Sequence, residues 1–288
     1  MNSSSLFIFA ACIFLYFLNP TRAATCHPDD EAGLLAFKSG ITEDPSGILS
    51  TWKKGTDCCS WNSIFCFNKR VYRIFIEIPF DSDGSRNFLS GTISPSLAKL
   101  QHLSDITLVN LKNVTGPSPQ FLFQLPKLDN LILDSVGLSG PLPVKKIGSL
   151  IKLTGFQIPG NRFTGPFPNS LSKLTRLQYV DISWNDISGS PVRFLNQAEN
   201  LWEFHATGNK LRFDFGKVKI PERLDKLVLS TNLIYGRVPP SVASLEELNV
   251  RDNHLCGELP KLPPGRFYTS DFEGNDCLCG FPLPPCKA

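Results

Sequence analysis

The most regular feature of the chain is an apolar spacing that returns every 21 to 25 residues. Its clearest copy consists of Leu177, Val180, Ile182, Asn185, Ile187 and Gly189. Successive copies end in a glycine, at Gly91, Gly116, Gly140, Gly165, Gly189, Gly236 and Gly257, with Phe213 replacing the glycine in one copy. A period in the twenties with this skeleton predicts one strand and one return segment per repeat. Such units bury their apolar sides only against their neighbours, so the chain is predicted to form a solenoid.

The skeleton is that of a leucine-rich repeat, and it predicts an α/β solenoid in the form of an arc. Strands are expected to begin at Val71, Leu103, Leu128, Leu153, Leu177, Leu201, Leu224 and Leu245, which gives about eight repeats. The strands of successive repeats should form a parallel concave sheet. Side chains along a strand alternate between the core and the surface. Function is therefore sought among the positions that face outward from this sheet.

An asparagine recurs after most of the predicted strands, at Asn87, Asn161, Asn185, Asn209, Asn232 and Asn253. An inward amide at this place can bond backbone groups of adjacent turns that parallel strands leave without partners. Val136 interrupts the series, and one extra residue in the second repeat moves Asn113 out of register. Asn113, Val114 and Thr115 form a glycosylation sequence. Because Asn113 lies outside the asparagine series, we predict that it carries a glycan.

The N-terminal residues predict the compartment. Residues 6–18 are an unbroken apolar run, and a site of small residues ends at Ala23. This arrangement is typical of a secretory signal peptide, and the run is too short for a membrane span. We therefore assign residues 1–23 to a signal peptide and expect a secreted protein of the extracellular space or cell wall, without a membrane span.

Cysteines divide the rest of the chain. Cys12 belongs to the signal segment, and the others form two clusters of four: Cys26, Cys58, Cys59 and Cys66, then Cys256, Cys277, Cys279 and Cys286. An even number in an oxidising compartment indicates disulfides. Each cluster allows three pairings, and strain in bonds between chain neighbours favours Cys26 with Cys58, Cys59 with Cys66, Cys256 with Cys277 and Cys279 with Cys286. A metal site at Cys277 and Cys279 is the second interpretation, and few histidines lie nearby to support it.

These clusters predict caps at both ends of the repeats, because terminal repeats would otherwise expose their apolar core. Residues 24–70 are assigned to an N-terminal cap, 71–268 to the repeats and 269–288 to a C-terminal cap. In the first cap, the acidic residues from Pro28 onward predict a helix start, followed by an apolar stripe. That stripe consists of Leu34, Leu35, Phe37 and Ile41. An insertion at 81–86 should bulge from the first repeat.

Charge is unevenly distributed over the predicted faces. Nine acidic residues occupy outward strand positions: Asp105, Asp129, Asp134, Asp181, Glu203, Asp225, Glu246, Glu247 and Asp252. Only Lys226 and Arg251 are basic there, although Lys and Arg outnumber Asp and Glu in the whole chain by 29 to 26. Twelve basic residues are assigned to the edges and the convex back: Lys99, Lys112, Lys127, Lys145, Lys146, Lys152, Arg162, Lys173, Arg176, Lys217, Lys219 and Arg223. We expect a solenoid that is acidic inside and basic outside.

Aromatic residues gather on the acidic side in the fifth and sixth repeats. Asp181 and His205 should occupy the same place on neighbouring strands, about 5 Å apart. Tyr and Trp are frequent anchors of protein interfaces. The candidate partner-binding residues are Asp129, Asp134, Tyr179, Asp181, Trp184, Trp202, Glu203, His205 and Asp225. The alternatives are simple solvation of charged faces and an intramolecular contact between Asp181 and His205.

A catalytic role for Asp181 and His205 is a third interpretation. The sequence offers it no nucleophile motif, no oxyanion loop and no phosphate-binding loop. We therefore predict a protein that is not an enzyme and has no cofactor or metal. Opposed charge steers partners, so the acidic strip suits a basic protein, and the basic back suits a polyanion such as pectin. Nucleic acid is not expected as a partner outside the cell.

Several motifs together resemble the plant polygalacturonase-inhibiting proteins, which are short secreted leucine-rich-repeat proteins. They are the head Cys26-His27-Pro28-Asp29-Asp30, the element Asp57-Cys58-Cys59-Ser60-Trp61, the turn Asn253-His254-Leu255-Cys256-Gly257, the irregular stretch 211–218 and the tail Cys277-Leu278-Cys279-Gly280. The resemblance covers nearly the whole chain after the signal segment.

The resemblance implies a cell-wall protein of plant defence that binds microbial endopolygalacturonase through its concave face. Asp181, Trp184, Trp202 and Glu203 hold places comparable to acidic and aromatic binding residues of that family. One departure is the repeat number, because those inhibitors usually carry more than the eight repeats counted here. A second hypothesis is therefore a noncatalytic recognition module that binds a peptide, a receptor ectodomain or pectin in signalling or wall assembly.

Overall fold

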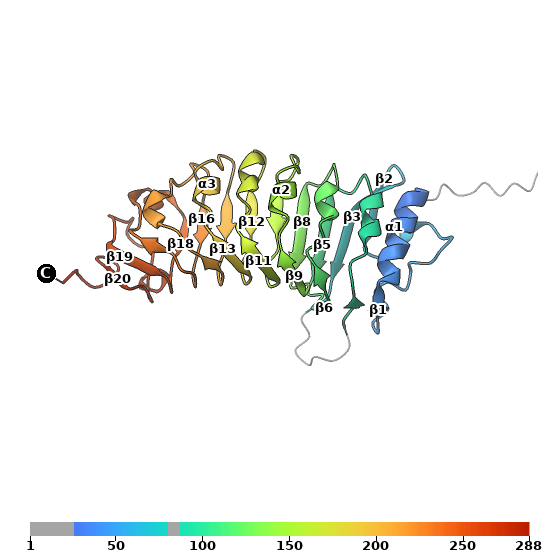
Figure 1. Ribbon diagram of the computed structural model, residues 1–288, viewed down its shortest axis with the longest axis horizontal. Coiled ribbons are helices and arrows are strands. Elements are labelled where there is room, and N and C mark those ends of the chain that lie inside the picture. The colour runs from blue at the N-terminus through green and yellow to red at the C-terminus, as the bar shows by residue number, and fades with distance from the viewer. Residues whose placement is uncertain (1–25, 80–86, 288) are drawn as a thin grey trace, which may run out of the picture.

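The computed structural model describes residues 26–79 and 87–287 as an elongated stack of repeats (Figure 1). Helix α1 (Pro28–Ser39) lies at one end, and strands β19 (His254–Glu258) and β20 (Cys277–Cys279) lie at the other. The predicted signal peptide and the insertion at 81–86 fall outside the described residues. Each repeat contributes one strand to a long sheet and then returns through short elements on the other sides.

The long sheet is the predicted concave sheet. Its nine strands are β2 (Ile64–Phe67), β3 (Arg70–Glu77), β5 (Asp105–Val109), β8 (Asn130–Asp134), β10 (Gly155–Gln157), β12 (Tyr179–Asp181), β14 (Glu203–His205), β16 (Lys226–Val228) and β18 (Glu247–Asn249). All neighbours pair in parallel except β2, which pairs antiparallel with β3. From β5 to β18 each strand begins two residues after its predicted leucine. The predicted leucine-rich-repeat solenoid is therefore confirmed.

A second set of strands lies on the return path and was not predicted. Five form one sheet: β7 (Gly116–Pro117), β9 (Leu138–Pro141), β11 (Arg162–Pro166), β13 (Asp186–Gly189) and β15 (Lys210–Leu211). Smaller sheets flank it, with β1 (Ile41–Glu43), β4 (Ser90–Gly91) and β6 (Asn113–Val114) on one side and β17 (Tyr235–Gly236), β19 and β20 on the other. The recurring glycines lie in these strands. Gly91 shows why: its φ is 141°, and an added Cβ would lie 2.1 Å from the Gly40 carbonyl oxygen.

Short helical turns complete the repeats. They are α2 (Val144–Ile147), α3 (Val192–Leu195), η1 (Cys58–Ser60), η2 (Pro95–Lys99), η3 (Leu122–Gln124), η4 (Asn169–Lys173), η5 (Phe215–Lys217), η6 (Pro240–Ser244) and η7 (Thr269–Asp271). Leu97, Leu171 and Val242 each turn inward from such a segment and are at most 1% exposed. The core is therefore a column of leucine, isoleucine and phenylalanine enclosed by the strands and these turns.

The asparagine ladder is present and joins one repeat to the next. In Asn209, Oδ1 accepts a hydrogen bond from the Ile187 amide at 2.9 Å, and Nδ2 donates to the carbonyls of Ile182 and Ala206 at 2.8 and 3.3 Å. Equivalent bonds are made by Asn161, Asn185, Asn232 and Asn253, and all five side chains are at most 8% exposed. Each amide satisfies buried backbone groups of two repeats, as predicted.

The asparagine ladder differs from the prediction at both of its ends. Asn87 is exposed and accepts a hydrogen bond from the Ser46 hydroxyl at 2.8 Å, so its assignment to the ladder was wrong. The first repeat contacts the cap instead of a preceding repeat, since β4 pairs with β1. At the other end Asn275 takes a ladder place and accepts from the Leu255 amide at 3.0 Å. Asn275 was missed because no leucine skeleton surrounds it. Asn113 lies exposed in β6, outside the ladder.

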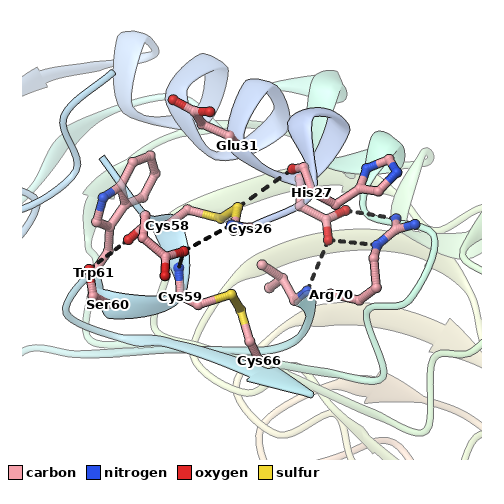
Figure 2. Close-up of a disulfide and its surroundings, with 12 residues drawn as sticks. Cys26, His27, Glu31, Cys58, Cys59, Ser60, Trp61, Cys66 and Arg70 are labelled. Carbon is pink, nitrogen blue, oxygen red and sulfur yellow. Dashed lines mark hydrogen bonds and ion pairs between the residues drawn. A yellow bond between two sulfur atoms is a disulfide. The ribbon is translucent and has the colours of Figure 1, made fainter. Parts of the chain in front are cut away.

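Helix α1 covers the open end of the repeats, as expected for a cap. Leu34 and Phe37 are at most 2% exposed, whereas Ile41 belongs to β1 because the helix ends at Gly40. Including Ile41 in the helical stripe was therefore wrong. Asp30 does more than favour a helix start: its buried carboxylate accepts from Arg70 Nε and Nη2 at 2.9 Å and from the Val71 amide at 2.9 Å (Figure 2). This ion pair joins the cap to the first repeat.

Four disulfides fix the two caps, and their pairing is the favoured one: Cys26–Cys58, Cys59–Cys66, Cys256–Cys277 and Cys279–Cys286. Figure 2 shows the first two beside Trp61, which stacks on Trp52 with ring centroids 5.7 Å apart. Because Cys277 and Cys279 bond to different cysteines, neither offers a thiolate to a metal.

Replacing one ladder amide should destabilise the stack. In Asn209→Ala, the Ile187 amide and the Ile182 carbonyl lose their buried partner, and we expect a loss of about 1–3 kcal/mol in the free energy of unfolding. Urea denaturation followed by circular dichroism measures this loss. The matched control is Gln124→Ala, an exposed amide on η3, with an expected change within about 0.5 kcal/mol. Equal effects of the two substitutions would contradict the role of the ladder.

Asn113 provides a second test of the register. Because its side chain is exposed, we expect protein secreted by plant cells to lose mass on treatment with an N-glycosidase, and Asn113→Gln to abolish that loss. Mass spectrometry of the intact protein gives the readout. A glycosidase-sensitive mass in the Gln variant, or none in the parent, would contradict the assignment.

Candidate partner-binding surface

Three neighbouring strands of the concave sheet bring acidic and aromatic side chains together. We call this the central patch, and it consists of Tyr179, Asp181, Trp184, Trp202, Glu203, His205, Asp225 and Lys226. Strand pairing aligns Tyr179 with Glu203 and Asp181 with His205, while Glu203 is aligned with Lys226 on the next strand. The predicted common position of Asp181 and His205 is thus present, and residues 47 positions apart in the chain share one surface.

The Trp202 indole is held from two sides. Its ring centroid lies 6.0 Å from that of Tyr179, and its Nε1–H donates to the Asp225 carboxylate. The side chain is nevertheless 47% exposed. An aromatic ring that is fixed before binding loses little side-chain entropy on binding, which favours its use as an anchor.

Trp184 is the most exposed ring of the central patch, at 61%. It follows β12 in the left-handed backbone region, with φ of 56°, where bulky residues are uncommon. The neighbouring ladder residue Asn185 and a bond from the Trp184 amide to the Thr207 carbonyl at 2.7 Å hold this conformation. The ring lies over Gly208, since a Cβ built there would be 2.5 Å from its Cε3 atom. The absence of a side chain at 208 therefore lets the indole lie against the sheet.

Glu203 is the electrostatic centre of the patch. Its carboxylate lies 3.0 Å from Lys226 Nζ and 3.3 Å from His205 Nε2. The hydrogen bond to Glu203 raises the pKa of Lys226. His205 faces Glu203 because residues two apart on a strand share a face, and Asp181 instead accepts from the Ser183 amide at 2.8 Å. The sequence suggested an intramolecular contact between Asp181 and His205, whereas His205 contacts Glu203 in the structure.

The remaining two candidates lie apart from the central patch. Asp129 directly precedes β8 and Asp134 is its last residue, and β8 is separated from β12 by β10. Asp134 accepts from the Ser135 hydroxyl at 2.8 Å. Asp129 adjoins a separate groove at the edge of the sheet, where its Oδ1 is buried without a hydrogen-bond partner. The structure therefore brings together seven of the nine candidates.

Part of the acidic strip is neutralised by bases that the sequence did not assign to it. Arg73 from the first repeat lies 3.6 Å from Asp105, and Arg266 from beyond the last strand lies 3.5 Å from Glu246. Arg251, which the sequence did assign to the strip, pairs with Asp252 at 3.2 Å. Negative charge with exposed aromatic rings is consequently concentrated in the middle strands.

Sequence reasoning missed an aromatic group at the N-terminal end of the same sheet. The Arg73 guanidinium carbon lies 5.6 Å from the ring centroid of Phe65 and 5.1 Å from that of Phe75, within cation–π range. Phe65 and Phe67 alternate with the buried Ile64 and the half-buried Cys66, and this alternation could have indicated an outward-facing strand. Within residues 26–79 and 87–287 no helix is long and apolar enough to span a membrane.

Comparison with known proteins gives the lineage. Two family models match: Leucine rich repeat N-terminal domain over residues 27–67 and Leucine Rich Repeat over residues 244–265. Polygalacturonase inhibitor 2 of Arabidopsis thaliana is 31% identical, with 91% of this chain and 93% of that protein covered. Leucine-rich repeat protein FLOR 1 of Arabidopsis thaliana is also 31% identical, with 98% and 99% covered.

Solved structures agree on the fold. A plant ice-binding protein aligns with a TM-score of 0.58 and 26% identity, covering 91% of this chain and 99% of that one. PEPR1 bound to AtPEP1 aligns with a TM-score of 0.66 and 26% identity, covering 83% of this chain and 33% of that one.

The polygalacturonase inhibitor of Vitis vinifera is 31% identical over an alignment of 342 positions that covers 100% of both chains. Since this chain has 288 residues, at least 54 of those positions are gaps in it, which exceeds two repeats of the length from Gly165 to Gly189. Missing repeats, as expected from the sequence, would account for gaps of this total length. By its sequence over nearly its whole length, the chain belongs to the polygalacturonase-inhibitor family of leucine-rich-repeat proteins.

Proposed function

We propose that the protein is a noncatalytic extracellular binding protein that inhibits a microbial endopolygalacturonase through the central patch. The observation that carries this proposal is the preorganised group of Trp202, Asp225 and Glu203 on an open sheet face. The relatives that align over 91% and 100% of this chain are named as polygalacturonase inhibitors, which supports the same conclusion.

The physical mechanism is steric blockade. An open face of parallel strands can accept a large rigid partner without a cavity. Exposed indoles at Trp184 and Trp202 supply apolar contact area at the centre, where interface energy is usually concentrated. Asp181, Glu203 and Asp225 outnumber Lys226, so the patch attracts a basic surface and speeds association. An inhibitor needs only to cover the substrate cleft of its target.

The second candidate is a recognition module for a peptide or a receptor ectodomain. It is favoured by the 54 or more gap positions relative to the inhibitor of Vitis vinifera, since two missing repeats would shorten the sheet by roughly 10 Å. It is also favoured by the likeness to PEPR1, whose solved structure contains AtPEP1. Pectin stays a prediction for the exposed basic residues of the edges and back, such as Lys145, Lys146 and Arg162.

The direct test measures binding of the secreted protein to a panel of fungal endopolygalacturonases. Changing Asp181 and Trp202 together to alanine removes one anchor and one charge of the patch, and we expect affinity for any bound enzyme to fall at least about a hundredfold. Calorimetry and a reducing-sugar assay follow binding and inhibition together.

The matched control changes one exposed acid and one exposed ring outside the concave sheet, Asp186→Ala with Tyr235→Ala. This pair should leave affinity within about threefold of the parent. Loss of binding in the control alone would move the interface to the strands of the return path, which include β13 and β17. No binding by the intact protein to any enzyme of the panel would favour the recognition module.

Lys226 tests the sign of the partner's charge. Lys226→Met removes the cation beside Glu203 and makes the patch more negative, so association with a basic partner should accelerate about two- to fivefold at low ionic strength. Added salt should erase the gain because of screening. Surface plasmon resonance at two salt concentrations measures the rates, and slower association would contradict an acidic binding surface.

A further inference from the structure

A separate groove of about 350 Å³ runs along the edge of the concave sheet at which its parallel strands begin. It starts at β2 and β3 and reaches the repeat that contains β12. His102, Lys127, Lys152 and Arg176 line it, and each directly precedes the first buried leucine of its repeat. Successive repeats therefore place basic side chains in one row, about one strand spacing apart. We call this the edge groove.

One end of the edge groove is apolar. Phe67 and Tyr72 line it, and they are 70% and 38% exposed. Arg70 is also present, but the buried Asp30 holds its guanidinium through two bonds of 2.9 Å. The Arg70 charge is thus largely compensated, and this end presents mainly rings. Exposed rings beside a groove lose contact with water when an apolar group packs on them.

The middle of the groove holds the Asp129 carboxylate, which is a hydrogen-bond acceptor, and the imidazole of His102, which contacts Lys127. Asp129 lines this stretch of the groove, and a carboxylate accepts hydrogen bonds from N–H donors. Next to it, Lys127 Nζ lies 3.0 Å from His102 Nδ1. Burial and the neighbouring Lys127 lower the pKa of His102. Because a lysine ammonium only donates hydrogen bonds, His102 Nδ1 is the acceptor in this contact.

The far end of the groove is cationic. Lys152 and Arg176 lie on neighbouring repeats, and both are exposed. Along its length the groove thus changes from rings to the Asp129 acceptor with Lys127 beside it, and then to the two exposed cations. From β3 to β12 it crosses four strand spacings, roughly 19 Å, which an extended peptide spans with about six residues.

We propose that the edge groove is a second binding site, distinct from the central patch, for an extended acidic peptide segment with an apolar side chain at one end. The apolar side chain packs on Phe67 and Tyr72, a backbone N–H donates to Asp129, and acidic side chains pair with Lys152 and Arg176. A peptide can present these groups in order. A homopolymer with one carboxylate per unit would place a negative charge beside Asp129 and nothing purely apolar on Phe67.

Fluorescence anisotropy with a labelled hexapeptide, Phe-Ser-Glu-Asp-Glu-Asp, tests the proposal. Reversing both cations in Lys152→Glu with Arg176→Glu should weaken binding about tenfold or more, because attraction becomes repulsion at two exposed sites. The matched control is Lys145→Glu with Lys146→Glu on α2, which carries the same charge change outside the groove and should leave affinity within about twofold. The Asp181→Ala and Trp202→Ala pair should also leave it unchanged.

Three results would overturn the proposal. The first is equal weakening of binding by the test pair at Lys152 and Arg176 and by the control pair at Lys145 and Lys146, which would reduce the effect to net charge. Equal binding of a peptide with serine in place of phenylalanine would remove the apolar contact. Tighter binding of a galacturonate hexamer than of the peptide, with the same sensitivity to Lys152 and Arg176, would make the groove a carbohydrate site.

Discussion

The structure depends on one constraint: backbone groups that turn inward after each concave strand need partners inside a column otherwise filled by leucine and phenylalanine. The ladder asparagines meet this need, since one side chain such as Asn209 bonds backbone groups of two consecutive repeats. Leaving a buried amide unsatisfied costs about as much free energy as several surface contacts contribute. A change of register between repeats would leave such amides unsatisfied, so the register is fixed. Both caps serve the same end by closing the column with disulfides and the Asp30–Arg70 pair.

Fixed register explains how residues far apart in the chain come together in the central patch. Tyr179, Glu203 and Lys226 occupy paired positions on three strands, so the ring contacts and the ion pair between repeats follow from the ladder. Trp184 adds a second consequence. It precedes a ladder residue, and the left-handed conformation that this place requires turns its indole onto Gly208 and outward. The central patch is thus built directly beside the asparagine ladder.

Sequence alone predicted the features that depend on period and covalent geometry: the strand positions, the inward asparagines and the four disulfide pairs. It did not predict those that depend on contacts between distant segments. The second sheet has strands of two to five residues, too short for an alternating pattern. Asn87 and Ile41 were misplaced because the first repeat packs on a cap with a different backbone path. Ion pairs such as Arg73 with Asp105 and Lys226 with Glu203 need the fold to bring them together.

The central claim is that partners bind the middle of the concave sheet. The four tryptophans allow a direct test, since Trp184 and Trp202 are exposed there while Trp52 and Trp61 are at most 3% exposed in the N-terminal cap. Protein labelled with 5-fluorotryptophan should give four fluorine resonances. On addition of an unlabelled endopolygalacturonase that the protein inhibits, the resonances of Trp184 and Trp202 should shift and lose solvent exposure while the other two stay unchanged. Inhibition without any change at Trp184 and Trp202 would contradict the account.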